Sequence, residues 1–249
     1  MMSAAPMTRI IHLHIPKTAG TAFRAAFEQA SGGRVRICPH FNEQNFADID
    51  PSQFDFFSGH FGFKTATELG GQIITVVRNP VDRFVSLYYF WRKLSEKGIE
   101  KSERTNLANK YPLSEFVKIR DEPQLLAALY NTMTWQIAYG TSLAQRRELR
   151  KVGTTDHQIV QLALANLATF TLVGVQENLE FFAAAMASKF SVALKINKVN
   201  VGKARPVVDD IGTATISAIR DWSFMDLQVY EHVVKLVSAA APERKAHDR

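Results

Sequence analysis

The sequence predicts a three-layer α/β/α sandwich with a mostly parallel central sheet and a helical C-terminal half. Three observations support this fold class. A short apolar strand at 10–15 runs into a tight turn and then into an amphipathic helix at 20–30. A second apolar strand, 73–77, runs into a helix at 81–97 in the same way. Mostly helical periodicity follows, interrupted by one further strand at 171–175, and this order of elements is typical of layered α/β proteins.

Other elements are expected around these strand–helix units. A Gly32-Gly33 turn leads to a short strand at 34–37, and another strand, 54–58, ends at Gly59-His60. The polar segment 97–111 breaks the apolar periodicity, so we predict a loop or a lid there. Further helices are expected at 113–120, 124–139, 155–169, 179–190, 211–222 and 225–239, with a loop around 199–206.

The composition is typical of a globular protein of one domain. The 249 residues are 46% hydrophobic and 22% charged, enough for one sizeable α/β domain but short for two, so we expect a single domain over 1–249. No apolar run reaches membrane-spanning length, and residues 1–8 lack the long apolar region of a signal peptide. The single cysteine, Cys38, excludes an internal disulfide and agrees with a reducing compartment. These features predict a cytoplasmic protein without stable membrane insertion.

The chain is basic, with a net charge of +6 and a pI of about 9.4. Basicity suits anionic partners, of which nucleic acids are one class. The positive charges are scattered, however, and there is no basic tail, zinc-ligand spacing or aromatic RNA-binding motif, so no nucleic-acid partner is expected. The one cluster, Arg146-Arg147 to Arg150-Lys151, is interpreted as a solvated helix face.

The first strand ends in a loop suited to binding a phosphate-like anion. N–H groups at the start of the following helix point outward, and the helix dipole adds partial positive charge there. Lys17 adds a full charge, and two threonine hydroxyls add donors. The loop is not a Walker A motif, because the lysine precedes the glycine; an ordinary strand–loop–helix with a surface lysine is the alternative. The candidate binding residues are Pro16, Lys17, Thr18, Ala19, Gly20, Thr21 and Ala22.

The second strand–helix unit carries another cationic side chain at its strand end. Arg78 follows the strand directly, and Asn79-Pro80 is typical of a helix N-cap followed by proline in the first turn. Ser86 lies two helical turns further on. Ligands of open α/β sheets bind beyond the carboxyl ends of the strands. A lysine and an arginine at two such ends therefore predict a ligand with two separated anionic groups.

Together these motifs resemble those of the sulfotransferases that use 3′-phosphoadenosine 5′-phosphosulfate (PAPS). The family's P-K-T-[AG]-[GST]-[ST] loop is similar to the segment that begins at Pro16. The R-[DN]-P-x-[ED]-R-x-x-S-x-Y-Y-F pattern of the uronosyl 2-O-sulfotransferases resembles residues 78–90. Their G-H-[VF] and V-G-V-x-E segments resemble residues 59–61 and 173–177. The similarity runs from residue 10 to residue 177 in the family's order and is loose beyond it. Without a membrane anchor, the chain resembles a soluble bacterial member.

The resemblance implies the P-loop-like sulfotransferase fold and a role for each motif in binding PAPS. In the family, the lysine loop holds the 5′-phosphosulfate, whereas the strand-end arginine and the serine eight residues later hold the 3′-phosphate. These positions are Arg78 and Ser86 here. The family commonly places basic residues over the nucleotide in a C-terminal loop, where Lys203 and Arg205 lie; a solvated basic loop is the equal alternative for these two.

Sulfuryl transfer to a hydroxyl needs positive charge at the leaving group and a base for the hydroxyl proton. Lys17 is expected to supply the charge, so no metal is required. A lone histidine is usually structural, but the match to the family's base segment favours His60 as the base; Ser58 replaces the second histidine that this segment often has. The expected reaction transfers the sulfuryl group to a carbohydrate hydroxyl and releases 3′-phosphoadenosine 5′-phosphate (PAP). The identity of the carbohydrate acceptor, the hydroxyl that is sulfated and the oligomeric state are not predicted.

Two other function classes remain open at this point. An ATP-dependent P-loop-like kinase would need a Walker glycine pair, which is absent. A non-catalytic glycan- or nucleotide-binding module would be expected to lose Lys17 or His60, and both are present. Two further residues near these motifs have open roles. Arg83 is interpreted as structural, and Glu177 either orients Lys17 or Arg83 or caps a strand end.

Overall fold

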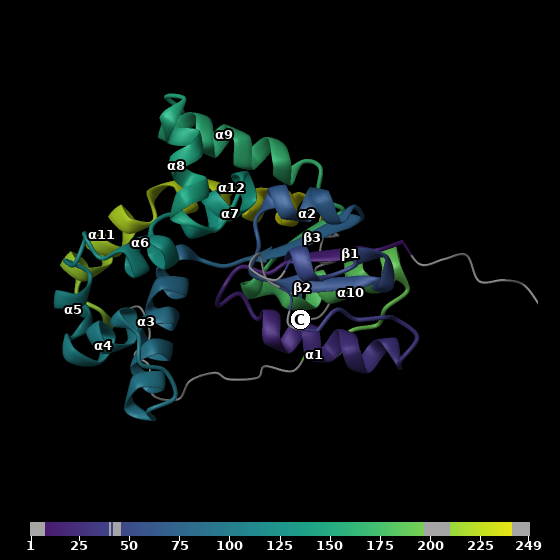
Figure 1. The fold of residues 1–249 in the computed structure, drawn as a ribbon, viewed down its shortest axis with the longest axis horizontal. Helices are drawn as coiled ribbons and strands as arrows, with labels where there is room; N and C mark the ends of the chain where they lie inside the picture. The colour runs from purple at the N-terminus through teal and green to yellow at the C-terminus, as the bar shows by residue number, and fades with distance from the viewer. Residues whose placement is uncertain (1–7, 40, 42–45, 197–209, 241–249) are drawn as a thin grey trace, which may run out of the picture.

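The computed structural model describes residues 8–39, 41, 46–196 and 210–240. These residues form a three-layer α/β/α sandwich around a four-stranded sheet, as predicted (Figure 1). The strand order is β2-β1-β3-β4, and all three pairings are parallel. The strands are β1 (Ile10–Leu13), β2 (Phe56–Gly59), β3 (Gln72–Val77) and β4 (Leu172–Val175).

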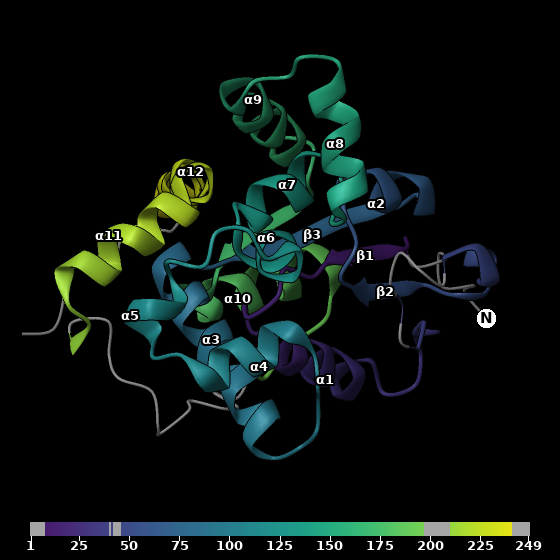
Figure 2. The ribbon, with the colours of Figure 1, turned by 60° about the vertical axis from the view of Figure 1, so that its left-hand side comes forward.

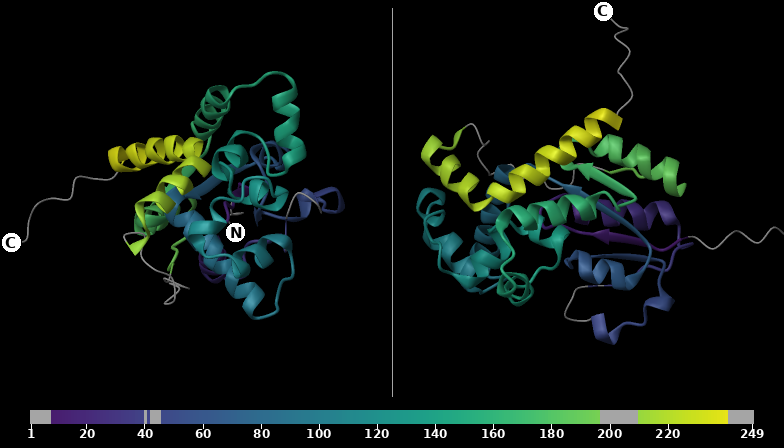
Figure 3. Two further views of the ribbon diagram at one scale, coloured as in Figure 1. Left: turned by 90° about the vertical axis from the view of Figure 1, so that its left-hand side faces the viewer. Right: turned by 90° about the horizontal axis from the view of Figure 1, so that it is seen from above.

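Helices cover both faces of the sheet because each strand is apolar on both sides. Along β1, Ile10 faces α1 (Gly20–Ser31) and α10 (Leu179–Phe190), whereas Ile11 and Leu13 face the opposite layer. That opposite layer contains α2 (Phe63–Leu69), α7 (Thr132–Ala138), α9 (Asp156–Leu167) and α12 (Phe224–Ala240). The helix α12 packs on β4, α7 and α9, so the last described helix returns to the sheet (Figure 3).

A third apolar cluster lies beyond the sheet, where α3 (Pro80–Glu96) leads away from β3 (Figure 2). Its centre contains buried aromatic side chains, among them Phe84, Phe116 and Trp222. Helices α4 (Glu103–Lys110), α5 (Leu113–Phe116), α6 (Pro123–Leu129) and α11 (Thr213–Trp222) surround α3 there. The described chain also has short 3₁₀ turns at Phe46–Asp48, Pro51–Gln53 and Gln176–Asn178.

The segment 97–111, which was predicted to be a loop or a lid, contains the helix α4 and packs on α3. Ser102 and Thr105 form a capping box that starts this helix. Only Thr105 and Ala108 are buried, so the helix has too few apolar residues for its period to stand out in the sequence. The prediction of a loop was therefore wrong for residues 103–110.

The single helix predicted at 124–139 is two helices, α6 and α7. The chain breaks at Asn131, which adopts a left-handed conformation with φ of 48°. Its backbone N–H donates to the Trp222 carbonyl (3.0 Å), and its side-chain oxygen accepts from the Met225 N–H (2.8 Å). The apolar periodicity of the sequence continues through Asn131, whereas the hydrogen bonds that impose the break come from residues about 90 positions away.

Three smaller expectations also need correction. Residues 34–37 form no regular strand, and Ile37 makes one isolated bridge to Phe56. The helix α2 was not predicted, and α8 (Leu143–Lys151) was expected only as the helix face that carries the arginine cluster. The guanidinium of Arg146 is not on a solvated face, because it is buried and donates to the carbonyl oxygens of Leu126 and Ala127 on α6. The expected loop at 199–206 lies outside the described residues.

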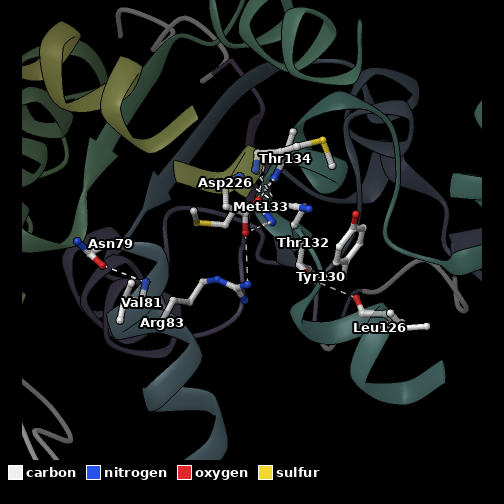
Figure 4. Close-up of polar contacts among 12 residues, drawn as sticks. Asn79, Val81, Arg83, Leu126, Tyr130, Thr132, Met133, Thr134 and Asp226 are labelled. Carbon is white, nitrogen blue, oxygen red and sulfur yellow. Dashed lines mark hydrogen bonds and ion pairs between the residues drawn. The ribbon is translucent and has the colours of Figure 1, made fainter. Parts of the chain in front are cut away.

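A buried ion pair links α3 to the opposite helical layer (Figure 4). Arg83 Nη2 lies 3.5 Å from Asp226 Oδ2, and both side chains are fully buried. The Asp226 carboxylate also accepts hydrogen bonds from the backbone N–H and hydroxyl of Thr134 (both 2.8 Å) and from the Met133 N–H (3.3 Å). Arg83 thus has the structural role that the sequence indicated, with its partner on α12.

Candidate functional site

The predicted site residues gather at the carboxyl ends of three adjacent strands. The register pairs Leu13 with Gly59, so the loop after β1 and His60 after β2 start at the same edge of the sheet. Arg78 follows β3 at this edge as well. Because neighbouring parallel strands end together, groups that are distant in the sequence become neighbours here.

The loop between β1 and α1 has the backbone shape of an anion-binding turn. Lys17 and Ala19 have positive φ values of 70° and 68°, which turn the backbone sharply before the helix. The Thr18 hydroxyl donates to the Ile15 carbonyl (2.8 Å) and so braces the loop from inside. Ala19, the N-cap, gives no side-chain acceptor to the first-turn N–H groups, and that turn has no acidic residue. The start of α1 therefore carries uncompensated partial positive charge.

Gly20 is required by the packing of this loop. A Cβ at this position would lie 1.9 Å from Nε2 of His14. The imidazole of His14 thus occupies the space where any other residue would place its side chain. The glycine of the loop motif therefore lets the first turn of α1 approach the end of β1 closely.

Arg78 connects the two strand ends that the sequence assigned to anion binding. Its Nη1 donates to the Lys17 carbonyl at 3.0 Å, and its Nη2 lies 3.8 Å from Asp82 Oδ1. The side chain is largely buried. The guanidinium is therefore held beside the β1–α1 loop, in contact with the backbone of Lys17.

The start of α3 is fixed by both a cap and a carboxylate. The side-chain oxygen of Asn79 accepts from the N–H groups of the next turn, and Pro80 occupies the first helical position, as predicted. The Asn79 N–H donates to Glu177 Oε1 at 2.9 Å. Tyr230 on α12 also donates to Glu177, and burial, together with this carboxylate, raises the pKa of Tyr230 to about 12. Glu177 thus holds Asn79, whereas the carboxylate that pairs with Arg83 is that of Asp226. Ser86 is half-buried further along α3.

Lys17 has an aromatic partner that was not predicted. Its Nζ lies 4.1 Å from the ring centroid of Phe90 on α3. Tyr88 and Trp91 on the same helix are buried, but Phe90 is 41% exposed. A signal was available in the sequence, because Asp82, Ser86 and Phe90 are spaced four residues apart and so share one face of α3.

His60 is oriented by a backbone carbonyl. Its Nδ1 lies 2.8 Å from the His14 oxygen, and the two imidazole centroids are 4.4 Å apart. A carbonyl oxygen can only accept, so Nδ1 carries a proton and, in the neutral ring, Nε2 keeps its lone pair. Protein packing around the ring lowers the pKa of His60, and the hydrogen bond to His14 opposes this effect. The ring is suited to accepting a proton at Nε2.

The imidazoles of His12, His14 and His60 form a row, with the His14 ring in contact with both others. The His12 and His14 rings stack 5.4 Å apart, and His12 Nδ1 lies 2.8 Å from the hydroxyl of Ser58, the residue that replaces the family's second histidine. Burial, together with the neighbouring His60, lowers the pKa of His12 to about 3 and that of His14 well below its ordinary value. Both rings are therefore neutral near physiological pH, which agrees with a structural role.

Two of the expected binding residues, Lys203 and Arg205, lie outside the described residues. Within the described ranges, no group of three or more histidine, cysteine or acidic side chains is arranged to hold a metal ion. No helix in the same ranges combines the length and apolar character needed to cross a membrane.

The fold and the site define an α/β protein with a lysine-bearing loop and a largely buried arginine at the carboxyl edge of a parallel sheet. A model of the sulfotransferase family matches residues 2–232, and the chain belongs to this family. No curated protein sequence matches the chain. Membership of the family indicates an enzyme that transfers a sulfuryl group to an acceptor.

Proposed function

We propose that this enzyme transfers the sulfuryl group of PAPS to a hydroxyl of a carbohydrate acceptor. The observation that carries the proposal is the hydrogen bond from Arg78 Nη1 to the Lys17 carbonyl (3.0 Å). It joins the strand-end arginine to the loop that carries the lysine, which supports a single ligand with phosphate groups at two positions. In an ordinary strand–loop–helix with a surface lysine, neither cation would be expected to bind a ligand.

The residues present fit both ends of the donor. The uncapped first turn of α1 and the Lys17 ammonium suit the 5′-phosphosulfate, because the same loop supplies backbone N–H groups and a cation. The Arg78 guanidinium and the half-buried Ser86 hydroxyl suit the 3′-phosphate. In the chain order of the resemblance, Lys203 and Arg205 would complete the nucleotide site.

The reaction requires charge stabilisation at the leaving group and removal of one proton. In an in-line displacement, the acceptor oxygen forms a bond to sulfur while the bond from sulfur to the bridging phosphate oxygen breaks. Lys17 would stabilise the negative charge that grows on this bridging oxygen. His60 Nε2 would accept the proton of the acceptor hydroxyl, since its Nδ1 already donates to His14.

The carbohydrate acceptor is proposed from the similarity of residues 78–90 to the uronosyl 2-O-sulfotransferases. The net charge of +6 agrees with an acidic glycan. The buried Cys38, the single cysteine of the chain, agrees with action in a reducing cytoplasm. We also propose that 1–249 acts as one domain.

A direct test is transfer from ³⁵S-labelled PAPS to a panel of glycans, with Lys17→Ala as the inactive variant. The matched control is Lys110→Ala, since the Lys110 ammonium also lies over an aromatic ring, that of Tyr111, but on α4. We expect Lys17→Ala to abolish turnover and Lys110→Ala to retain it. Turnover by folded Lys17→Ala at the wild-type rate would refute the assigned role.

Thermal shifts with PAP and with ATP·Mg²⁺ separate the proposal from the kinase alternative. PAP should raise the melting temperature, because a ligand that binds only the native state stabilises it. Stabilisation by ATP·Mg²⁺ alone would favour the kinase. Stabilisation by PAP in the absence of transfer to any glycan would favour a binding module.

A further inference from the structure

The side chain of Gln136 on α7 reaches across to the two segments that hold His60. Its Nε2 donates to the His14 carbonyl at 3.0 Å and to the Phe61 carbonyl at 2.9 Å. Because both partners are carbonyl oxygens, which only accept, the amide nitrogen and not the amide oxygen must face them. One amide group therefore ties the end of β1 to the segment after β2.

This amide shares an acceptor with the imidazole of His60. The His14 carbonyl accepts from both Gln136 Nε2 and His60 Nδ1, the latter at 2.8 Å. Phe61, whose carbonyl takes the second amide proton, is the neighbour of His60 in the chain. Gln136 thus fixes the carbonyl that orients the ring and also the backbone that carries the ring.

Stability alone does not explain a glutamine at this position. Gln136 is fully buried, and among the described residues its Oε1 has no hydrogen-bond partner. A buried polar atom without a partner lowers the stability of the fold. What the glutamine contributes at this position is the pair of hydrogen bonds that hold the His14 and Phe61 carbonyls.

We propose that Gln136 is a positioning residue for His60, which keeps the proton on Nδ1 and the lone pair of Nε2 directed to the acceptor hydroxyl. The inference rests on the proposed function as far as the hydroxyl is concerned. The orientation of the ring is a property of the protein itself. It can be measured without donor or acceptor.

The test replaces Gln136 by methionine, which keeps the length of the side chain and removes both donors. Gln136→Glu is the second variant, because it keeps the shape and offers at most one donor. The matched control is Asn166→Leu: Asn166 Nδ2 is also a buried amide that donates to two carbonyls, but they are those of Ile137 and Ala138 (both 2.9 Å) and not those of His14 and Phe61.

Three quantities are measured on each protein. Long-range ¹H–¹⁵N spectra of histidine-labelled protein give the tautomer of His60, with the signal assigned by its loss in His60→Asn. Single-turnover transfer from PAPS gives the rate of the chemical step, and calorimetry gives the affinity for PAP. We expect the wild type to hold His60 with the proton on Nδ1. In Gln136→Met the other tautomer should become populated and the rate should fall about 10- to 100-fold, with PAP affinity unchanged.

The control should lose stability but keep the tautomer and the rate. If Gln136→Met fails to fold, a smaller change of the same kind in Gln136→Glu carries the conclusion. A His60 signal and a rate that are unchanged in the folded Gln136 variants would overturn the proposal. If the wild type transfers nothing from PAPS while the Gln136 variants still change the tautomer, the proposed function is wrong and the positioning of His60 stands.

Discussion

The ammonium of Lys17 lies 4.1 Å from the ring centroid of Phe90, although the two residues belong to different strand–helix units. The ring stands on α3, the helix that follows Arg78, and is 41% exposed. A cation over an aromatic face at this distance is held electrostatically. The contact ties the lysine side chain to α3, whose N-cap residue follows Arg78 directly in the chain.

We therefore predict that Phe90→Leu weakens donor binding by about two- to fivefold, the equivalent of the roughly 0.5–1 kcal/mol of an exposed cation–π contact. Phe90→Tyr retains an aromatic face and should bind PAP with wild-type affinity. Calorimetric titration of the three proteins with PAP measures the effect. Tighter binding by Phe90→Leu would mean that the ring competes with the donor for Lys17.

A second prediction concerns recognition of the 3′-phosphate. Ser86→Ala should weaken PAP more than its 3′-dephospho analogue. Arg78→Ala should reduce PAP affinity about 10- to 100-fold, since a hydrogen bond to a charged group contributes about 1.5–3 kcal/mol. Because Arg78 also holds the Lys17 carbonyl, its variant should weaken the dephospho analogue too, although less. Titration of both nucleotides gives the ratios, and equal losses in both variants would place these residues away from the 3′-phosphate.

The strand ends of this site could be predicted because the information is local. A buried run of four to six residues followed by Pro16-Lys17-Thr18 or Arg78-Asn79-Pro80 specifies a strand, a turn and a helix start with little help from the rest of the chain. Parallel pairing then places these ends together. The same local logic predicted the N-cap at Asn79, which the structure confirms.

The contacts made by distant residues could not be predicted in this way. Gln136 lies 122 positions from His14, and Glu177 lies 98 positions from Asn79. Neither pair has a spacing or a periodicity that marks it, because a hydrogen bond to a backbone carbonyl or N–H places no demand on the partner's side chain. The break at Asn131 was missed for the same reason, since Trp222 and Met225 impose it.

The third prediction concerns the buried pair of Arg83 and Asp226. Asp226→Ala should lower the free energy of unfolding by about 3–5 kcal/mol, because it leaves an uncompensated guanidinium in the core. The double variant Arg83→Met, Asp226→Asn removes both charges and keeps an acceptor for the Thr134 N–H. It should recover most of the loss. Urea denaturation measures all three proteins, and a double variant less stable than Asp226→Ala would contradict this account.

The fourth prediction is an acid-dependent loss of stability from His12. Its pKa falls from 6.5 to about 3 in the folded state, chiefly through burial, so the unfolded chain binds one more proton between these values. Stability from this group is therefore complete above about pH 6.5 and decreases as the pH falls. Between pH 7 and pH 5 the loss should be about 2 kcal/mol.

His12→Asn tests this linkage, because the amide can still bond to the Ser58 hydroxyl but does not titrate. The variant should be less stable at pH 7 and should lose about 2 kcal/mol less than the wild type on transfer to pH 5. His157→Asn, at an exposed position on α9, should keep the wild-type pH dependence. Equal pH dependence in wild type and His12→Asn would show that folding does not lower the pKa of His12.

The last prediction concerns His60 as the base. His60→Ala should lower kcat by about two to four orders of magnitude, the usual contribution of general base catalysis, and should leave PAP affinity unchanged. In the wild type, kcat/KM should rise with pH through the pKa of His60, since only the neutral imidazole accepts a proton. Packing around the ring lowers this pKa, so activity should already be maximal near pH 7 and decline on acidification below the ordinary value of about 6.5.

His12 and His14 do not contribute to this pH profile of kcat/KM, because burial keeps both rings neutral near the pH at which His60 titrates. A purely structural His60 leads to a different result: the folded fraction of His60→Ala would retain activity and the acid limb of the wild type. Activity per folded molecule, measured across pH with His157→Ala as the control, separates the two. Full activity in folded His60→Ala would place the base on another residue, and the carboxylate of Glu177 would be the next to test.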